Sequence, residues 1–441
     1  MALRSRAALI FAFGAALYLA RVEGPYHFDD WVTPVSDPAS QSLGAFVEHV
    51  HRTLRPLSKL SFALEGSLGL GDAPALRRAV SAAFHGASSA LVFLLAARLR
   101  AGLWAAFAAA LLFAVHPIHG EMVWALAGRG AAMALSLGLG ALLAQLRGRR
   151  WLAAALLLGA CLSRETAIAF ALPMAALELS RRGTLRSVAH RLEPCLTVVL
   201  LAVAFVAQNA RYRQLIDYSA HGRPFGYSVS AQVEALPHGF SLYVRPSALS
   251  IDHGLPLSHS AASPAFWLGA ALLVGLGALL VWAARARRPA LAVGAALVLA
   301  ALLPTQSVIP KLDPLTERPF ATALAGAALL LAHGLRAAFR RARWRQAALG
   351  GVALTAVLLV GATLRRGALY ASDVALWRDA ARKSVSNARP HHNLAVALLE
   401  AGRPDEAREA LARARRIDPF DSELRALALR LDPSLASGGP R

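Results

Sequence analysis

The sequence is poor in charge, in cysteine and in acidic residues. Only 17% of its 441 residues are charged, whereas 56% are hydrophobic. A soluble domain rarely has this composition, so an ordinary soluble protein is excluded and repeated membrane-crossing segments are predicted. The two cysteines, Cys161 and Cys195, fall in or beside apolar segments. A fold held together by disulfides is therefore not expected.

Basic residues outnumber acidic residues by 47 to 26, which gives a formal net charge of +21. The arginines stand at the ends of apolar segments and do not gather in one patch, so we expect no nucleic acid as a partner. Alanine, leucine and arginine are frequent at the expense of isoleucine, lysine and asparagine. This bias indicates a high-GC bacterial source. Together with the apolar segments, it predicts a multi-pass protein of the bacterial cytoplasmic (inner) membrane, in contact with membrane lipid.

Long apolar runs predict an all-α fold, a polytopic membrane bundle of about eleven helices. We expect these helices near residues 7–22, 79–97, 103–117, 130–146, 151–162, 166–180, 194–210, 264–284, 289–303, 320–338 and 346–364. With the N-terminus inside, nineteen arginines fall on the inner side, as the positive-inside rule requires. A cleaved signal peptide over residues 7–20 is the alternative for the first helix. We interpret residues 236–249 as an interfacial helix, because a span there would move the later arginine groups outside.

Acidic residues give an independent check on this topology. Sixteen precede residue 370, and fourteen of them fall on the outer side. Glu121 and Glu165 stand close to the ends of apolar segments, where an ionised group is costly to bury. Polar outer loops would account for the bias but not for these two positions. The sequence therefore predicts a functional acidic cluster at the outer membrane boundary.

Two adjacent carboxylates, Asp29 and Asp30, directly follow the first helix. Such a pair can raise one carboxyl pKa or share a cation, and either property suits a base that removes a proton from a hydroxyl. A solvated loop start is the alternative. In the same loop, residues 44–54 and 59–68 have helical spacing and are expected to lie on the membrane interface. Arg55, between them, could contact a phosphate or lipid headgroups.

His116, His119 and Glu121 lie within six residues of each other, and His and Glu are ligands that zinc accepts. Their spacing matches no known metalloprotease pattern, and Pro117 ends the helix between the two histidines. We therefore favour a polar lining of a substrate cavity over a metal site. A divalent cation stays an open alternative, and no cofactor is certain.

Further cations stand at other outer ends of apolar segments. Arg129 could reach the same cavity and bind the donor phosphate there. Arg164-Glu165 interrupts an apolar hairpin either as a structural ion pair or as a phosphate contact through Arg164. Glu317-Arg318 opens a later helix, where Arg318 is another phosphate candidate. Asp252 lies on the outer side within Ser250-Ile251-Asp252-His253, and it joins Glu317 as a residue expected to shape the site.

The composition changes at residue 370, where the apolar spans end. Residues 393–419 match the 34-residue tetratricopeptide (TPR) pattern, and the stretches 373–385 and 421–430 resemble partial neighbours that cap this repeat. After an odd number of spans this tail lies outside. The predicted domains are a membrane domain over 1–369 with an outer loop at 23–78, a TPR-like domain over 370–433 and a disordered tail over 434–441.

These motifs, taken in order along nearly the whole chain, resemble the transmembrane, TPR-containing O-mannosyltransferases and their bacterial relatives in the C-type glycosyltransferase superfamily. The resemblance implies a sugar, mannose above all, carried on a polyprenyl phosphate and transferred with inversion on the outer face. It implies that Asp29 and Asp30 are the catalytic base and that Glu121 is a further catalytic residue. Glu121 and Glu165 would also shape the site. Arg164 and Arg318 would hold the lipid phosphate. The acceptor would be a protein Ser/Thr hydroxyl or a glycan.

Two other classes of function stay open at this point. A non-catalytic membrane scaffold would dock envelope partners through the TPR-like tail. A transporter of lipid-linked sugars would need acidic residues buried in the middle of a span, and the sequence contains none there.

Overall fold

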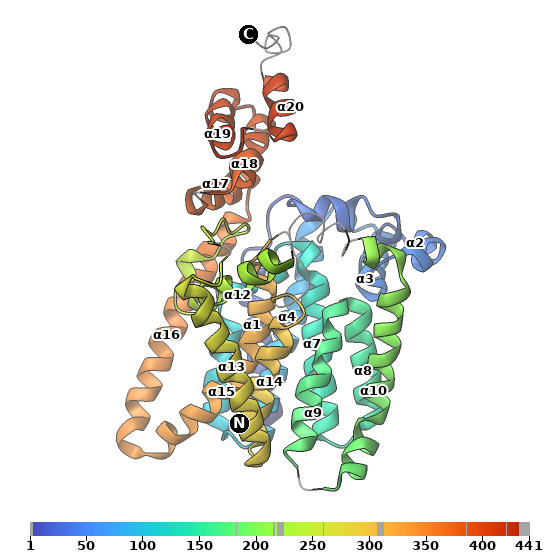
Figure 1. Ribbon diagram of the computed structural model, residues 1–441, viewed down its shortest axis with the longest axis vertical. Helices are drawn as coiled ribbons and strands as arrows, with labels where there is room; N and C mark the ends of the chain where they lie inside the picture. The colour runs from blue at the N-terminus through green and yellow to red at the C-terminus, as the bar shows by residue number, and fades with distance from the viewer. Residues whose placement is uncertain are drawn as a thin grey trace.

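The computed structural model describes residues 3–181, 183–214, 217, 225–258, 260–306, 313–384, 386–419 and 421–431. Within these ranges the chain forms helices and no β-strand, which confirms the all-α prediction. Figure 1 shows a helical bundle with the C-terminal helices projecting from one end. We call this the tail end, and the opposite end, near the N-terminus, the far end. The predicted disordered segment 434–441 lies outside the described residues.

Each of the eleven predicted membrane segments falls on a helix. These helices are α1 (Leu3–Leu19), α4 (Pro74–Arg98), α5 (Leu103–Ala114), α7 (Arg129–Leu146), α8 (Arg150–Ser163), α9 (Ala171–Leu179), α10 (Leu185–Gln208), α13 (Pro264–Arg285), α14 (Pro289–Leu302), α15 (Glu317–Arg340) and α16 (Ala342–Leu369). Among the described residues, six helices are long and apolar enough to cross a membrane: α4, α7 with its preceding turn, α10, α13, α15 and α16. A seventh span would form if α5 and Pro117–Val123, bent by 49°, count as one. These are the helices of a multi-pass membrane protein, and the number eleven stays a prediction.

Proline and glycine set several helix boundaries. Pro74, Pro264 and Pro289 open α4, α13 and α14, since the first turn of a helix leaves its N–H groups unpaired and proline has none to lose. At the far end, Gly102 and Gly148 adopt φ values of +87° and +74° in the turns before α5 and α8. Glycine reaches this backbone region at little cost, so these turns can stay short.

Small residues let neighbouring helices approach closely. A Cβ placed on Gly326 of α15 would lie 2.5 Å from the carbonyl oxygen of Gly294 in α14. A Cβ on Gly86 of α4 would lie 2.7 Å from the carbonyl oxygen of Phe11 in α1. Close backbone approach is a main source of packing energy between helices in lipid.

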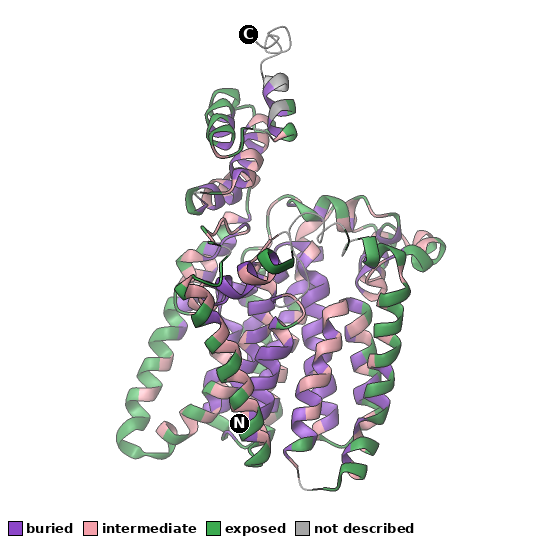
Figure 2. Ribbon diagram, viewed as in Figure 1, coloured by how far each residue is buried: buried purple, intermediate pink, exposed green. Residues whose placement is uncertain are grey.

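Apolar side chains cover the outside of the peripheral helices. Trp267 and Val274 of α13 are largely exposed, as are Leu354 and Val357 of α16. Figure 2 shows α16 mostly exposed, whereas α7 in the middle of the bundle is buried. A bilayer would cover these exposed side chains, which agrees with a membrane location.

Shorter elements close the tail end of the bundle. They are η1 (Trp31–Val35), η2 (Pro38–Ser40), α2 (Leu43–His49), η3 (Val50–Arg52), α3 (Pro56–Ser67), η4 (Pro117–His119), α6 (Gly120–Val123), η5 (Leu126–Gly128), η6 (Glu165–Phe170), α12 (Phe225–Ser241) and η7 (Pro246–Ala248). The helix predicted at 59–68 corresponds to α3, whereas the helix predicted at 44–54 is divided into α2 and η3 and ends before Thr53. Their position on the membrane interface stays a prediction. The helix predicted at 236–249 is wrong in its bounds, because α12 starts earlier and ends at Ser241. Pro246 has no N–H to continue a helical hydrogen-bond ladder beyond that point.

The tail consists of α17 (Asp373–Lys383), α18 (Ala388–Glu400), α19 (Pro404–Ile417) and α20 (Ser422–Leu431). The predicted repeat corresponds to α18 and α19, and the predicted flanking stretches correspond to α17 and α20. Trp377, Leu394, Leu398, Ala407 and Leu411 belong to its own buried core. The tail is therefore a packed helical unit on top of the bundle.

Candidate active site

The two adjacent carboxylates after α1 face different surroundings. Asp30 is fully buried, and its carboxylate accepts hydrogen bonds from the backbone N–H groups of His27 (3.2 Å) and Ala127 (2.8 Å). Burial raises its pKa, an effect that these hydrogen bonds oppose. The Asp29 side chain is 51% exposed and lies 3.8 Å from Arg318. The pair therefore does not act as one unit: Asp30 holds the loop in place, and Asp29 is the accessible carboxylate.

Arg318 connects the first loop to the interrupted helix at residues 117–123. Its Nε lies 2.8 Å from Glu121 Oε1, and its Nη2 lies 3.8 Å from Asp29 Oδ2. Arg318 stands in the first turn of α15. The backbone N–H of the preceding residue, Glu317, donates a hydrogen bond to Glu121 Oε2 at 3.2 Å. Residues separated by nearly 300 positions in the chain thus meet at the tail end of the bundle.

A second group lies beside this one. Arg55, held in the left-handed backbone region at φ 58° before Pro56, donates from Nε and Nη2 to both oxygens of Glu165, at 2.9 and 2.8 Å. Burial alone would raise the pKa of Glu165, but Arg55 and then Arg164 lower it to about 2. The carboxylate is therefore ionised at neutral pH. The predicted structural ion pair between Arg164 and Glu165 is therefore wrong, because the close partner of Glu165 is Arg55.

Arg164 has no carboxylate partner within 4.0 Å in the part of the chain that the structure describes, and its Nη1 is buried without a hydrogen bond. Burial and the neighbouring Arg55 lower its pKa to about 9, while Glu165 acts in the opposite direction. A desolvated cation without a close partner is costly. An anion bound beside Arg164 would relieve this cost.

Arg164 and Arg318 line the same cavity. Its other walls come from η6, α7, α14 and the start of α15, and they include Ala131, Leu135, Phe170, Leu297, Ala301 and Pro319. Most of these side chains are apolar. The cavity therefore combines a cationic end with an apolar slot inside the bundle. We call Asp29, Arg55, Glu121, Arg164, Glu165 and Arg318 the arginine–carboxylate cluster.

Glu317 is fully buried behind this cluster. Its carboxylate accepts hydrogen bonds from the N–H of Ser250 (2.6 Å) and from Arg366 (3.2 and 3.3 Å), and it lies 3.1 Å from the ring of His253. These contacts fix the start of α15, so Glu317 shapes the site by orienting its neighbour Arg318. The sequence reasoning missed Arg366. An arginine at the outer end of an apolar segment, against the positive-inside pattern, was the available signal.

The two histidines of the His-Pro-Ile-His motif contact a backbone carbonyl and aromatic rings. His116 Nε2 lies 3.1 Å from the Tyr243 carbonyl oxygen, and the His119 ring packs 4.4 Å from those of His85 and Phe113. Neither histidine lines the cavity of Arg164 and Arg318. The prediction that they line it is therefore wrong, and both side chains pack between helices. Among the described residues, no three His, Cys, Asp or Glu side chains are arranged to hold a metal ion.

Arg129 also differs from its predicted role as a phosphate ligand. It is fully buried, pairs with Glu65 at 2.6 Å, and donates to Ser81 (3.2 Å), Ser61 (3.2 Å) and the Arg77 carbonyl oxygen (2.6 Å). Its ring of partners leaves no guanidinium edge toward the cavity. Arg129 is thus a structural cation that joins α3, α4 and α7.

Asp252 was predicted to shape the site, but its carboxylate anchors the tail. It accepts two hydrogen bonds from Arg389 of α18, at 2.6 and 2.8 Å, and one from Asn387 at 3.2 Å. Arg389 also pairs with Asp313 at 2.8 Å. Burial of Asp252 between the bundle and the tail explains why an acidic residue stands in this loop.

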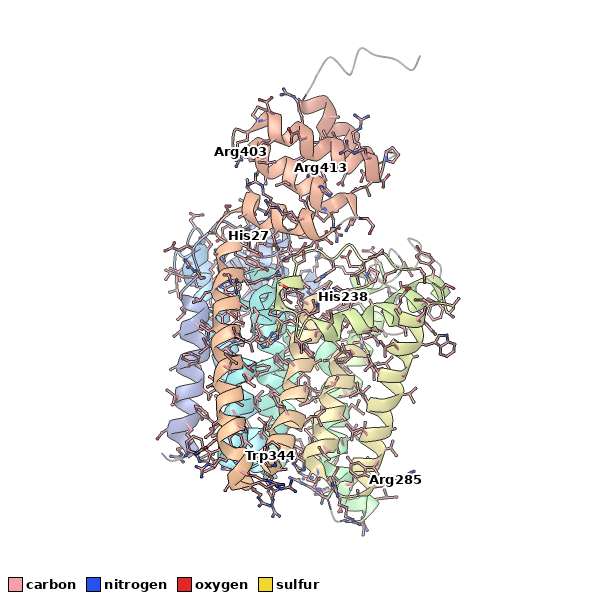
Figure 3. All side chains as sticks on the ribbon, turned by 90° about the vertical axis from the view of Figure 1, so that its left-hand side faces the viewer. His27, His238, Arg285, Trp344, Arg403 and Arg413 are labelled. Carbon is pink, nitrogen blue, oxygen red and sulfur yellow. The ribbon has the colours of Figure 1, made fainter. Side chains whose placement is uncertain are left out.

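Arg78 is a further residue that the sequence reasoning missed. It is fully buried in α4 and donates to the carbonyl oxygens of Trp124 (2.8 Å), Val22 (3.0 Å) and Gly24 (2.8 Å), and also to that of Pro25. It holds the start of the loop that carries Asp29. Figure 3 shows this end of the bundle, with His27 directly below the tail and Arg285 at the opposite end.

Comparisons with known proteins agree with this geometry. The tetratricopeptide repeat family matches residues 374–431. The chain is 32% identical over 255 residues to Protein O-mannosyl-transferase Tmtc2 of Drosophila melanogaster, a match that covers 52% of this chain and 25% of the relative. It is 37% identical over 147 residues to Protein O-mannosyl-transferase Tmtc1 of the same fly, which covers 32% of this chain and 16% of that relative. No solved structure matches.

The chain thus spans a quarter or less of the length of these curated relatives. Within that part, the resemblance inferred from the sequence motifs is confirmed: the chain is similar to the transmembrane O-mannosyltransferases that carry tetratricopeptide repeats.

Proposed function

We propose that this chain is an inverting membrane glycosyltransferase. It would move a sugar, mannose in the first instance, from a polyprenyl phosphate to a hydroxyl of a protein or glycan acceptor. One observation carries the proposal: the accessible carboxylate of Asp29 lies 3.8 Å from Arg318, which lines an apolar cavity together with the unpaired Arg164. The names of the two fly relatives, both O-mannosyl-transferases, support the same class of reaction.

The reaction needs a base on one side of the sugar and a cationic site for the leaving phosphate on the other. Asp29 would take the proton of the acceptor hydroxyl as its oxygen bonds to the anomeric carbon. The bond from that carbon to the phosphate oxygen breaks in the same step, and a single displacement inverts the configuration. Arg164 and Arg318 would stabilise the negative charge on the released polyprenyl phosphate, and the apolar slot would take the first part of the prenyl chain.

Glu121 has a different part in this mechanism. It pairs with Arg318 at 2.8 Å and lies 6% exposed, so it orients the guanidinium and does not compete for the acceptor proton. Arg55 and Glu165 brace the neighbouring wall through their two parallel hydrogen bonds. Such bidentate pairs fix geometry well.

We further propose that the tail end faces outward and the N-terminus inward. The far end carries arginine groups such as Arg98, Arg147 and Arg149, which line one groove with Arg4. Loops rich in arginine usually stay on the cytoplasmic side of a membrane protein, which supports this orientation. The bacterial cytoplasmic membrane stays a prediction from composition.

The decisive experiment is transfer of mannose from a polyprenyl-phosphate donor by the full chain in lipid nanodiscs, with Asp29→Asn as the test variant. Loss of a general base typically lowers the rate by about 10²- to 10⁴-fold, so we expect transfer to nearly vanish. Glu48→Gln, an exposed acid on α2 at the same end, serves as the matched control and should keep full activity. Equal transfer by Asp29→Asn and the wild type would refute the proposal.

A non-catalytic scaffold is the second candidate, favoured by the repeat at 374–431. A groove on the tail is lined by Arg378, Arg382, His391, Glu406 and Arg413, which suits a polar peptide partner. If the wild type transfers no sugar, and Asp29→Asn complements a deletion strain whereas Arg382→Glu does not, the scaffold function replaces the enzyme.

A further inference from the structure

The loop that carries Asp29 is held from two sides. On the bundle side, Arg78 donates hydrogen bonds to the carbonyl oxygens of Val22 and Gly24. The Asp30 carboxylate accepts a hydrogen bond from the backbone N–H of Ala127. Between these anchors, His27 and Phe28 lie against the tail. The residues immediately before the proposed base are therefore positioned by the C-terminal region, more than 340 residues away in the chain.

His27 makes two contacts with this region. Its Nδ1 lies 2.6 Å from a carboxylate oxygen of Asp373, in the first turn of α17, and its Nε2 lies 2.9 Å from the Tyr370 carbonyl oxygen. The His27 side chain is fully buried. Both ring nitrogens therefore lie within hydrogen-bonding distance of an oxygen atom of the C-terminal region. A hydrogen bond in which a carboxylate takes part is stronger than one between two neutral groups.

Phe28 adds an apolar contact and a backbone constraint. Its ring meets the buried Trp377 ring edge-to-face, with centroids 5.4 Å apart. Its φ of 43° places it in the left-handed region, which costs a residue with a side chain about 1–2 kcal/mol. The contact with Trp377 compensates part of the strain and keeps the turn in place.

The loop also approaches the tail closely at Gly24. A Cβ at this position would lie 2.1 Å from the Tyr370 carbonyl oxygen, and its φ is +126°. Only glycine fits there. The same carbonyl oxygen also faces His27, so Tyr370 and α17 together form a continuous surface for the loop.

We propose that α17 is a positioning element of the active site, in which Asp373 and Trp377 hold His27 and Phe28 so that Asp29 faces Arg318. This inference rests on the proposed function. It gives the first helix of the tail a part in the sugar transfer itself, separate from any docking of an acceptor. Asp373 touches no reacting group and acts through His27 alone.

The kinetic experiment compares full-length Asp373→Asn with Asp405→Asn. Asp405 stands in the first turn of α19 and is almost fully exposed, so it matches the helix position and charge change without contacting the loop. A base displaced by about 1 Å costs on the order of 10²-fold in rate, so we expect kcat of Asp373→Asn to fall roughly 10- to 100-fold while KM for donor and acceptor changes little. Asp405→Asn should behave as the wild type. Unchanged kcat, or a raised acceptor KM at unchanged kcat, would overturn the proposal.

Two substitutions of His27 separate its contacts. His27→Asn keeps a donor near the Nδ1 position facing Asp373, whereas His27→Gln keeps one near the Nε2 position facing Tyr370. We expect His27→Asn to retain the higher kcat. Adding Asp373→Asn to His27→Gln should cause no further loss, because the two side chains act as one contact. The opposite order, or fully additive losses, would contradict the arrangement.

A spectroscopic measurement makes the proposal independent of catalysis. A nitroxide is attached at Asp29→Cys after both native cysteines are replaced by alanine, and its mobility is measured by EPR with and without Asp373→Asn. Asp373→Asn should mobilise the label, and Asp405→Asn should not. A label that stays equally ordered refutes the positioning role even if the enzyme is active. If the label is released but the unlabelled wild-type chain transfers no sugar, the contact is supported and only the proposed function is refuted.

Discussion

The two ends of the helical bundle use arginine in opposite ways. At the tail end, Arg55, Arg129 and Arg318 each contact a carboxylate at 2.6–2.9 Å. At the far end, Arg4, Arg98, Arg147 and Arg149 line one groove, and no carboxylate is among its lining residues. Burial and then Arg98 and Arg149 lower the pKa of Arg147, so its nearest charged neighbours are like charges. Glu178, which pairs with Arg181 and Arg191, is the acidic exception near that end.

This difference separates two reasons for placing a cation at the end of a membrane helix. Far-end arginines are exposed, and their contribution is a charge difference across the bilayer that needs no particular partner. Tail-end arginines are desolvated, and a desolvated cation requires a geometrically specific anion. The tail-end arginines form the candidate site, so their substitution should change stability and transfer much more than substitution of far-end arginines. The predictions below test this contrast, from the largest effect to the smallest.

The largest loss of stability is expected for Arg129→Met. The substitution leaves the buried Glu65 with only Arg77, 3.5 Å away, as a cation. Breaking a buried pair costs about 3–5 kcal/mol, which should lower the unfolding temperature in detergent by on the order of 10 °C. Arg149→Met at the exposed far end is the matched control. Equal unfolding temperatures for the two variants would remove the distinction between the ends.

Among the arginines, the largest loss of transfer without unfolding is expected for Arg318→Ala. Removing a group that stabilises the leaving phosphate should reduce the rate by about 10²- to 10³-fold. Arg318→Lys should recover part of it, because the charge returns without the fork that spans Glu121 and Asp29. Transfer is measured in nanodiscs against Arg285→Ala, a far-end variant that should transfer normally. Loss of activity in both variants would point to a general charge effect instead.

A smaller and pH-dependent effect is expected for Glu165→Gln. The pKa of Glu165 is lowered in the folded protein, from 4.5 to about 2, so its ionised pair with Arg55 stabilises the fold above pH 4.5. That contribution, about 1–2 kcal/mol for a partly exposed pair, should shrink as the pH falls from 4.5 toward 2. Unfolding temperatures of wild type and variant should therefore differ at pH 7 and converge in acid. A gap that widens in acid would contradict the assigned sign.

The smallest effect is expected for Arg147→Ala at the far end. Its neighbours Arg98 and Arg149 repel it, so the substitution should change stability by less than about 0.5 kcal/mol. Transfer should also be unchanged. Thermal unfolding and the mannose assay on the same preparation check both statements, and a loss above about 1 kcal/mol would reveal an anion partner at this end.

Much of the bundle could be predicted because apolar runs and their arginine boundaries act locally. All eleven predicted segments fall on helices, and Asp29, Glu121, Arg164 and Arg318 do gather at one end. Which of several similar side chains reaches the site could not be predicted. Asp29 and Asp30 are adjacent and of the same residue type, and only the fold buries Asp30 while it leaves Asp29 accessible. Arg129 pairs with Glu65, and Asp252 pairs with Arg389. Both partners are distant in the chain.

The sequence by itself determined that this chain is an all-α membrane bundle with a helical repeat at its end, since hydropathy, charge bias and repeat spacing depend only on residue order. The tertiary structure decided which charges pair, which carboxylate stays accessible and that α17 supports the loop before Asp29. Those outcomes depend on desolvation and on distances of 2.6–3.8 Å between residues up to 346 positions apart. No local pattern encodes such distances, because they arise only when the helices pack.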